Sequence, residues 1–374
     1  MSEEEDYGQY PHIIIDNGTG YCKAGFSNEV GPRTVIPSCV GYPKYSDVIY
    51  NYSDKKEFYV GEEANRKRGI LKLNYPMENG VINNWDNMEK IWGYIFTNEL
   101  RAAPEEHNVM LTEAPFNPKE NREIMAQIMF ETFNVPNFFI YIQAILSLYS
   151  AGKYTGFVLD SGDGVTHSVP VFEGYCLPHA IIRHDVAGRD LTEYMIKLLY
   201  ETGFRCYSTA EKEIAKKIKE ECIYIPLDFQ KGYVEPYIYE LPDGNHVTLT
   251  DQRIRCPEAL FRPSLIGKEG SGIHEICHYS IQKCDIDLRK EFYYNIILSG
   301  GTTMIKGLSE RLTEDLKIIL GGSLSEVRVK PSENKFAIWQ GGAIASNLEP
   351  FESQWITKTE YEESGATIVH RKCF

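Results

Sequence analysis

One short pattern occurs twice in this sequence, and that internal repeat constrains the fold more than any other feature. Residues 12–15 (His-Ile-Ile-Ile) run into residues 16–20 (Asp-Asn-Gly-Thr-Gly). Residues 156–159 (Gly-Phe-Val-Leu) run into residues 160–164 (Asp-Ser-Gly-Asp-Gly). Each copy is an apolar run, an aspartate, a glycine-spaced turn and a second run of strand character, which predicts a β-hairpin with an aspartate at the end of its first strand. The copies lie about one domain length apart, so two domains with related cores are expected.

The rest of the chain alternates between strand and helix patterns, which indicates the α/β class. Helices are predicted over residues 117–133, 143–151, 190–200 and 209–222. In the first of these, Asn117 is the expected N-cap and Pro118 the first helical residue. Residues 295–304 predict a buried strand that enters a Gly-Gly turn before a helix, where backbone N–H groups can approach a phosphate. Taken alone, a plain tight turn is the simpler explanation of that stretch.

Composition excludes several classes of protein. With 374 residues the chain exceeds one compact core, and 43% hydrophobic and 25% charged residues are typical of a soluble globular protein. The longest apolar stretch is too short for a bilayer, so no membrane insertion is expected, and the acidic start of the chain is unlike a signal peptide. The nine cysteines form no C-x-x-C pair, which favours reduced thiols. A net charge of −14 argues against nucleic acid as a partner.

The two hairpins suggest a common chemistry. Glycines in both turns leave backbone N–H groups free to approach an anion, and two loops from two domains would clamp a polyphosphate. Asp16 and Asp160 would then repel the phosphates unless a hard cation such as Mg²⁺ lay between them, held mostly through water. Lys23, just beyond the first turn, can neutralise a phosphate oxygen. Without the paired hairpins, Lys23 would be interpreted as an exposed strand lysine.

No residue near these turns is an obvious strong base. Gln143 and His167 are the best candidates for orienting an attacking water, although a lone histidine in a strand is usually structural. Orientation without strong proton abstraction gives modest acceleration, so slow hydrolysis is predicted.

These motifs resemble those of the superfamily of actins, heat-shock chaperones and sugar kinases, and the chain as a whole resembles the actin family. The similarity runs from about residue 12 to the end. It is carried by the hairpin motifs and by residues 22–26, 67–71, 89–92, 111–115, 127–134, 187–190, 256–261, 298–304 and 368–374.

The resemblance implies a fold of two related domains, divided into four subdomains, around a central nucleotide cleft. The outer domain would comprise residues 1–150 and 337–374, with 38–75 as its smaller subdomain. The inner domain would comprise residues 151–336, with 187–268 as its smaller subdomain.

The resemblance also implies roles for single residues. The phosphates would contact Gly18, Thr19, Gly20, Lys23, Asp163, Gly164 and Val165. The rest of the nucleotide would contact Gly188, Lys219, Glu220, Gly300, Thr302, Met304 and Lys335. The water shell of the metal would be held by Asp16, Gln143 and Asp160. The attacking water would be positioned by Gln143 and His167.

The function implied is that of a cytoskeletal ATPase in the cytoplasm. It would bind ATP or ADP with Mg²⁺, which Ca²⁺ can replace in vitro, and polymerise into filaments. Polymerisation would stimulate hydrolysis, and the nucleotide state would control assembly and disassembly. Partners of the profilin, cofilin, gelsolin or myosin type are expected with altered contacts.

Several positions depart from the family pattern. Thr19 stands where a serine is usual, and Asn79 replaces a histidine that is often methylated. The loop over residues 42–59 differs strongly, and the segment over residues 230–240 is shorter. Lys268 places a charge at the tip of an otherwise apolar loop that joins filament strands, where apolar burial would be weakened. The partner groove is altered at Gln340, Ala345, Pro350 and Gln354.

Two other functions remain as alternatives. An actin-related protein could bind nucleotide as a subunit of a complex without forming filaments, and the altered loops are compatible with this. A sugar-kinase-like phosphotransferase would need a catalytic aspartate and a sugar pocket, and the sequence shows a motif for neither.

Overall fold

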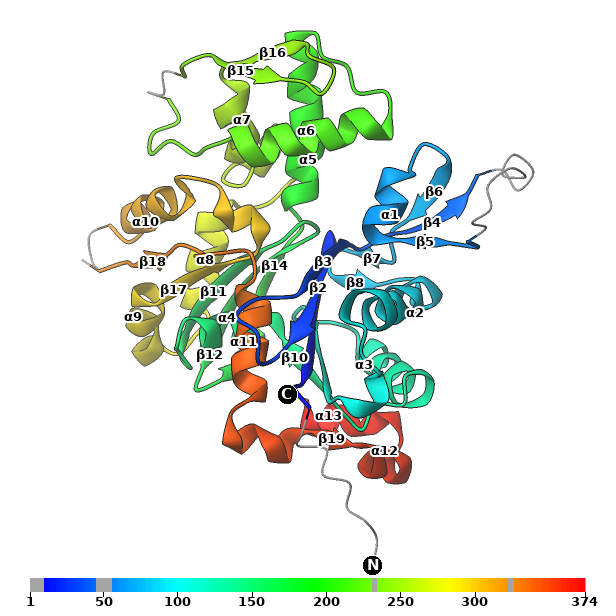
Figure 1. Cartoon of the computed structure of the whole chain (residues 1–374). Coiled ribbons are helices and arrows are strands. Elements are labelled where there is room, and N and C mark those ends of the chain that lie inside the picture. The colour runs from blue at the N-terminus through cyan, green and yellow to red at the C-terminus, as the bar shows by residue number, and fades with distance from the viewer. Residues whose placement is uncertain (1–9, 45–55, 231–233, 322–325, 374) are drawn as a thin grey trace, which may run out of the picture. The chain divides into compact units, whose positions relative to one another are not determined.

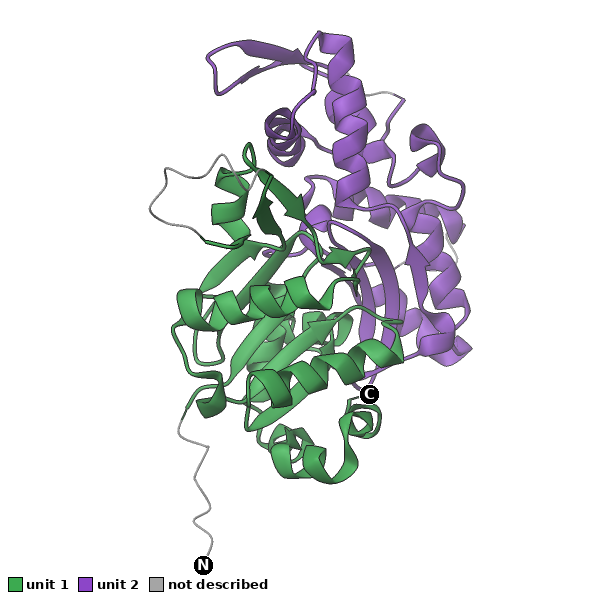
Figure 2. Cartoon of the chain, turned by 90° about the vertical axis from the view of Figure 1, so that its right-hand side faces the viewer, with its two compact units in different colours: residues 1–153, 336–374 green, residues 154–335 purple. Residues whose placement is uncertain are grey.

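The computed structural model describes residues 10–44, 56–230, 234–321 and 326–373. The chain forms two compact units, residues 1–153 with 336–374 (unit 1) and residues 154–335 (unit 2), coloured green and purple in Figure 2. Three predicted features lie wholly or partly outside the described residues. These are the acidic residues 3–6, most of the loop over 42–59 and the middle of the segment 230–240.

Unit 1 contains a six-stranded sheet in the order β19-β10-β9-β1-β2-β3. Its strands are β1 (Ile13–Asn17), β2 (Tyr21–Phe26), β3 (Thr34–Pro37), β9 (Val109–Glu113), β10 (Asn137–Ile142) and β19 (Ile356–Thr357). β1 pairs antiparallel with β2 and parallel with β9, and both β1 and β9 are buried along their whole length. Such continuous burial is typical of strands with both faces covered, and it explains their unbroken apolar sequence. The smaller sheets contain β4 (Val40–Pro43), β5 (Tyr59–Val60), β6 (Leu71–Asn74), β7 (Met77–Glu78) and β8 (Val81–Ile82).

Helices complete unit 1 (Figure 1). The α-helices are α1 (Gly61–Arg66), α2 (Trp85–Tyr94), α3 (Lys119–Gln127), α4 (Gln143–Ser150), α11 (Ala337–Ser346), α12 (Lys358–Ser364) and α13 (Val369–Lys372). The π- and 3₁₀-segments are η2 (Ile95–Leu100), η3 (Pro104–Glu106), η4 (Ile128–Thr132), η9 (Glu349–Gln354) and η10 (Ala366–Ile368). α11 is fastened to the sheet because Trp339 Nε1 donates a hydrogen bond to the Ile14 carbonyl at 3.0 Å. α4 and α11 are in contact through Gly341, where a Cβ would lie 1.8 Å from the Leu146 carbonyl oxygen.

Unit 2 repeats the arrangement of the unit 1 sheet. Its main sheet contains β11 (Gly156–Ser161), β12 (Thr166–Phe172), β13 (Tyr175–Cys176), β14 (Ile182–His184), β17 (Ile296–Ser299) and β18 (Val329–Lys330). β11 pairs antiparallel with β12 and parallel with β17, as β1 does with β2 and β9. β17 pairs parallel with β18, as β9 does with β10. The expectation of two related cores is therefore confirmed at the level of strand pairing.

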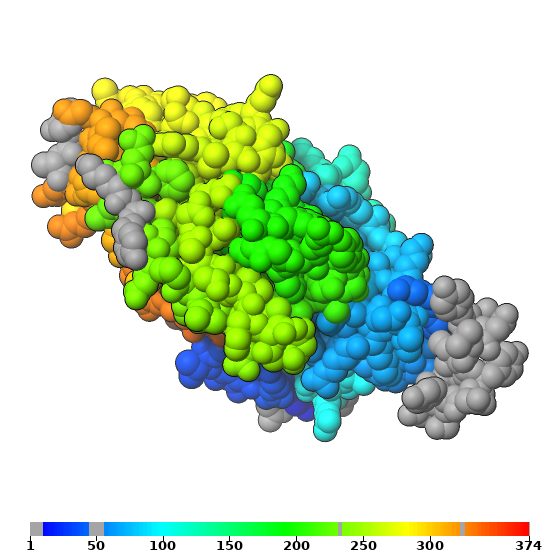
Figure 3. Space-filling view, turned by 90° about the horizontal axis from the view of Figure 1, so that it is seen from above, coloured from blue at the N-terminus to red at the C-terminus, as the bar shows by residue number. Residues whose placement is uncertain are grey.

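The helices of unit 2 cover this sheet and support a second, smaller one. The helical segments are η5 (Pro178–Ala180), α5 (Gly188–Leu199), η6 (Tyr200–Thr202), α6 (Thr209–Cys222), α7 (Gln252–Glu258), η7 (Pro263–Ile266), α8 (Ile273–Gln282), α9 (Ile286–Tyr294), η8 (Gly301–Met304) and α10 (Leu308–Ile319). The smaller sheet pairs β15 (Tyr237–Glu240) with β16 (His246–Leu249), and this part of the chain lies at the surface in the green tones of Figure 3. Ile238 on β15 is 65% exposed.

Most predicted elements are present, with one correction. The helices predicted over 143–151, 190–200 and 209–222 correspond to α4, α5 and α6. The helix predicted over 117–133 begins only at Lys119 and changes to the π-segment η4 at Ile128. Pro118, not Asn117, is the N-cap, and no side chain caps this end of the helix. The Asn117 side chain instead donates from Nδ2 to Glu113 Oε2 at 2.8 Å and accepts at Oδ1 from Asn121 Nδ2 at 3.2 Å.

Within the part of the chain that the structure describes, every helix is too short or too polar to cross a bilayer.

Candidate functional site

The first hairpin places Asp16 in a network of polar side chains. Asp16 is 1% exposed, and its Oδ1 accepts hydrogen bonds from Thr112 Oγ1 at 2.7 Å and Gln143 Nε2 at 3.1 Å. Its Oδ2 pairs with Lys23 Nζ at 2.5 Å, across the antiparallel register that aligns the two residues. Parallel pairing of Ile15 with Leu111 brings Thr112 next to Asp16. A buried carboxylate needs such partners, and together they fix its orientation.

The turn of this hairpin can be closed only by glycine at position 18. A Cβ on Gly18 would lie 2.5 Å from the Tyr21 carbonyl oxygen. The Ser38 hydroxyl, in the bend that follows β3, donates to the Gly18 carbonyl at 2.6 Å and holds the turn from a second segment. Thr19 Oγ1 accepts a hydrogen bond from the Gly80 N–H at 3.0 Å. The oxygen is therefore fixed in place, while the hydroxyl proton remains available for an acceptor.

Asn79 has a structural role beside this turn. Asn79 and Gly80 connect β7 to β8 and have φ angles of +49° and +81°. Two central residues with positive φ are typical of a type I′ hairpin turn, for which Asn-Gly is the preferred sequence. The departure at position 79 thus suits the turn that presents the Gly80 N–H to Thr19.

The second hairpin buries a histidine opposite its aspartate. Asp160 and His167 face each other in the register of β11 and β12, and they are 8% and 1% exposed. Among the described residues, neither ring nitrogen of His167 has a hydrogen-bond partner. Burial, with a smaller contribution from the charge of Arg183, lowers the pKa of His167 to about 4. The imidazole is neutral at pH 7, and buried nitrogens without partners are typical of a site that binds water or a ligand.

The turn of the second hairpin is held by two other segments. The Gly162 carbonyl accepts from the Gly188 N–H at 3.0 Å and from Thr302 Oγ1 at 2.7 Å. The Asp163 carbonyl accepts from the Arg189 N–H at 2.8 Å, and the two side chains form an ion pair. The start of α5 and the turn after β17 therefore converge on this loop.

Glycines in these supporting segments allow a close approach. A Cβ on Gly300, which has a φ of +86°, would lie 2.3 Å from the Ser161 carbonyl oxygen. A Cβ on Gly188 would lie 2.8 Å from Thr302 Oγ1. The Gly-Gly turn predicted from residues 295–304 is therefore part of the group around the second hairpin.

Lys219 reaches the same group from α6. Its side chain is 7% exposed, and its Nζ donates to the Gly188 carbonyl at 3.1 Å. Burial lowers the pKa of this lysine. A buried ammonium with one carbonyl partner has donors left for an acceptor on a ligand.

The remaining predicted residues are placed as follows. In unit 1, Gly20 ends the first turn, and in unit 2, Val165 is buried at the end of the second turn, next to Gly164. Glu220 is exposed on α6, Met304 is 46% exposed at the end of η8, and Lys335 is exposed at the end of unit 2. The structure thus groups Asp16, Lys23 and Gln143 in unit 1, and Asp160, His167, Gly188, Lys219, Gly300 and Thr302 in unit 2. The roles of all these residues remain predictions.

Thr112 is the functional candidate that sequence reasoning missed. Besides donating to Asp16, its hydroxyl accepts from the Asn17 N–H at 3.1 Å and from Gln143 Nε2 at 3.2 Å. The available signal was a hydroxyl residue at the end of the apolar run 109–111, a strand parallel to β1. Arg189 and Ser38, which hold the two turns, carry no comparable signal in the sequence.

The residues present fit a nucleotide polyphosphate better than a protein-ligated metal. Among the described residues, no group of three or more His, Cys, Asp and Glu side chains is arranged to hold a metal ion. The glycine turns, Lys23 and Lys219 supply backbone and ammonium donors, which suit anionic oxygens. A divalent cation would therefore be held largely by phosphate and water, with the carboxylates as outer partners.

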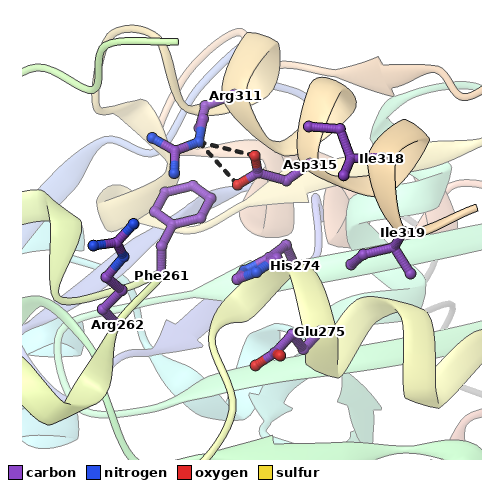
Figure 4. A pocket seen from close by; sticks show the side chains of 8 residues that line it. All are labelled: Phe261, Arg262, His274, Glu275, Arg311, Asp315, Ile318 and Ile319. Carbon is purple, nitrogen blue, oxygen red and sulfur yellow. Dashed lines mark hydrogen bonds and ion pairs between the residues drawn. The ribbon is translucent and has the colours of Figure 1, made fainter. Parts of the chain in front are cut away.

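A separate pocket of about 350 Å³ lies in unit 2 and contains none of these residues (Figure 4). It is lined by Phe261, Arg262, His274, Glu275, Arg311, Asp315, Ile318 and Ile319. Arg311 Nε contacts both Asp315 oxygens, at 3.0 and 2.9 Å, and Arg311 and Arg262 form ion pairs with the buried Glu258. Burial raises the pKa of Glu258 despite these cations. The arrangement ties α10 to the start of the loop before α8.

The family model described as Actin matches residues 8–374.

Proposed function

Because this chain belongs to the actin family, we propose that it is a slow ATPase that polymerises into filaments whose assembly depends on the bound nucleotide. The two hairpins are the observation that carries this proposal. Each unit presents a glycine turn at the same position of an equivalent sheet, with a buried aspartate at the end of the first strand. Members of this family are typically ATPases, and both turns suit phosphate oxygens.

The nucleotide would be bound by groups from both turns. Backbone N–H groups of residues 18–20 and 163–165 would contact the phosphates, with Lys23 as a further donor. Lys23 now pairs with Asp16, so binding a phosphate would exchange one anionic partner of the ammonium for another. Such an exchange limits the net gain in affinity and couples the nucleotide to the Asp16 network.

Mg²⁺ would supply charge neutralisation on the phosphates. The carboxylates of Asp16 and Asp160 and the amide oxygen of Gln143 would accept hydrogen bonds from its water shell. The hydrogen bonds from Gln143 to Asp16 and to the Asn17 carbonyl hold the amide beside the first turn.

Hydrolysis would be slow because the candidate groups orient water but abstract a proton weakly. His167 has a pKa lowered to about 4 by burial, so it is a neutral acceptor and a poor base at pH 7. The amide side chain of Gln143 has no atom basic enough to accept a proton near pH 7. These residues are therefore expected to position the attacking water. The resulting slow hydrolysis would mark how long a subunit has been in the filament.

Assembly surfaces differ from the family pattern in ways that affect partners more than the nucleotide site. Pro350 and Gln354 are exposed and can alter contacts with partners of the profilin, cofilin, gelsolin or myosin type. Gln340 Nε2 donates to the Val30 carbonyl at 3.0 Å. Ala345 is fully buried against Leu146 and Ile338, so this departure changes internal packing and not a partner contact.

The decisive experiment is sedimentation of the purified full chain with Mg-ATP, with phosphate release followed in parallel. ATP-dependent pelleting followed by phosphate release is expected. His167→Gln should pellet normally but release phosphate about tenfold more slowly, because it removes a positioned acceptor. His246→Gln is the matched control, since His246 is exposed on β16. Equal rates for all three proteins would contradict the role of His167.

The second candidate is a nucleotide-binding subunit that does not polymerise alone. Lys268 favours this candidate. It places a charge at the tip of the loop that would join filament strands, and it pairs with Asp190 of its own unit. This candidate predicts ATP binding with no sedimentation at any protein concentration tested, in which case the filament proposal fails. Rapid ATP-dependent phosphorylation of a sugar would instead support a phosphotransferase.

A further inference from the structure

The loop over residues 263–270 is fastened at its tip by a lysine. It begins with η7, turns at Gly267, which has a φ of +74°, and leads to α8. Lys268 Nζ donates to Asp190 Oδ1 at 2.7 Å and also contacts the Asp185 carbonyl oxygen. At its start, Arg262 pairs with the buried Glu258 beside the pocket of Figure 4. The loop is therefore held at its root and at its tip.

The segment that Lys268 contacts also holds the turn of the second hairpin. Asp190 is a residue of the first turn of α5, and its Oδ2 accepts from the Ala187 N–H at 3.0 Å. Directly between them, Gly188 and Arg189 donate their N–H groups to the carbonyls of Gly162 and Asp163, at 3.0 and 2.8 Å. One short segment thus connects Lys268 with the candidate phosphate-binding turn.

We infer that Lys268 is a positioning residue for this turn and couples the loop 263–270 to nucleotide binding. The inference rests on the proposed function for its ligand, a nucleoside triphosphate or diphosphate. Lys268 touches no ligand in this scheme. It acts through Asp185 and Asp190, whose segment sets the positions of the Gly162 and Asp163 carbonyls.

The solvent exposure of the two side chains limits how much the ion pair between Lys268 and Asp190 contributes. The side chains of Lys268 and Asp190 are 39% and 26% exposed, so the ion pair alone is screened by solvent and contributes modestly. The second contact, to a backbone carbonyl, restrains the segment itself. Coupling between two sites is reciprocal. A nucleotide bound at the turn of the second hairpin should therefore also slow amide hydrogen exchange in the loop over residues 263–270.

The test compares Lys268→Met, Lys268→Arg and Asp190→Asn with the parent protein as full chains. Asp190→Asn removes the charge of the partner while keeping an oxygen for the Ala187 N–H. Lys290→Met is the matched control, because Lys290 is an exposed lysine on α9 of the same unit. Amide hydrogen exchange is measured with and without ATP, together with the release rate of a fluorescent ATP analogue.

Lys268→Met and Asp190→Asn should raise exchange about threefold or more both in residues 263–270 and in residues 162–165 and 186–190. They should also speed release of the analogue by about threefold or more, within the usual range for coupled sites. Lys268→Arg should retain most of the parent behaviour, and Lys290→Met all of it.

Faster exchange confined to residues 263–270, with an unchanged release rate, would overturn the inference, because Lys268 would then only anchor its own loop. A Lys268→Arg variant that fails to retain the parent behaviour in either amide exchange or analogue release would also count against the inference. Exchange in the absence of nucleotide separates this inference from the proposed function. If the segments respond together but the chain binds no ATP, the connection stands and the proposed function fails.

Discussion

The backbone N–H of Gly80 donates a hydrogen bond to the Thr19 hydroxyl at 3.0 Å, joining the turn of the first hairpin to the turn between β7 and β8. Thr19 is 6% exposed, so the bond is made in a site with little water. The hydroxyl can accept this bond and donate its own proton at the same time. Residues 79 and 80 would therefore respond to whatever the Thr19 hydroxyl binds.

Thr19→Val tests this bond with a side chain of the same shape. Losing the hydroxyl leaves the Gly80 N–H without its acceptor, which should lower the free energy of unfolding by about 1–3 kcal/mol. Urea unfolding of the nucleotide-free protein measures that change. Thr19→Ser keeps the hydroxyl and is the control, with an expected loss below about 1 kcal/mol. Equal losses in both variants would contradict a specific contribution of this hydrogen bond, because Thr19→Ser keeps the hydroxyl that accepts it.

Lys23→Met tests the ion pair with Asp16. The lysine side chain is 15% exposed and the aspartate side chain 1%, so the substitution leaves a buried carboxylate with only its neutral partners. Unfolding free energy should fall by about 1–3 kcal/mol. ATP affinity should fall about tenfold or more, the effect of one charge-assisted hydrogen bond.

Lys119→Met is the control for this prediction, because Lys119 is exposed at the start of α3. Isothermal titration with Mg-ATP and urea unfolding provide the two readouts. A loss of stability without any loss of ATP affinity would show that Lys23 stabilises the buried Asp16 carboxylate and does not bind the nucleotide.

His167 should make the protein less stable in mild acid. Burial lowers its pKa to about 4 in the folded state, against 6.5 for an ordinary histidine. Its contribution to stability is therefore complete above pH 6.5 and is lost as the pH falls from 6.5 towards 4, because the unfolded chain binds the proton more readily. Between pH 7.5 and pH 5 the loss from this group should be about 2 kcal/mol.

The measurement is urea unfolding of the parent protein and His167→Gln at a series of pH values. The variant cannot titrate at this position, so its stability should fall less steeply below pH 6.5. Burial also lowers the pKa of His12, His184 and His274, so part of the slope will remain in the variant. Parallel curves for the two proteins would mean that His167 is accessible to protons in the folded state.

The sequence was most informative where one local pattern determines one local structure. Each hairpin required an apolar run, an aspartate and glycines at fixed spacing, and both formed with Asp16 and Asp160 near the ends of their first strands. The helix predicted over residues 143–151 ends at Ser150, two residues before Gly152, whose φ of +70° is typical of a glycine that follows a helix.

Features that depend on distant contacts were not predictable. Thr112 meets Asp16 only because β9 pairs with β1, and residues 96 positions apart carry no mutual signal in a single sequence. The change from α3 to the π-segment η4 inserts one residue into the helical repeat, which a period of 3.6 residues cannot reveal. The tie between Lys268 and Asp190 likewise joins residues far apart in the chain, 78 positions from each other.

Gly341→Ala should destabilise unit 1 although alanine favours helices. In the interior of α11, the exchange would gain about 1 kcal/mol from intrinsic helix propensity. The new Cβ would lie 1.8 Å from the Leu146 carbonyl oxygen of α4, so one of the two helices must move. Separating two packed helices costs more than the gain, and a net loss of about 3 kcal/mol or more is expected. Gly31→Ala is the control, since a Cβ there meets nothing within 4 Å. Thermal unfolding that ranks Gly341→Ala equal to or above Gly31→Ala would contradict the close contact of α4 and α11.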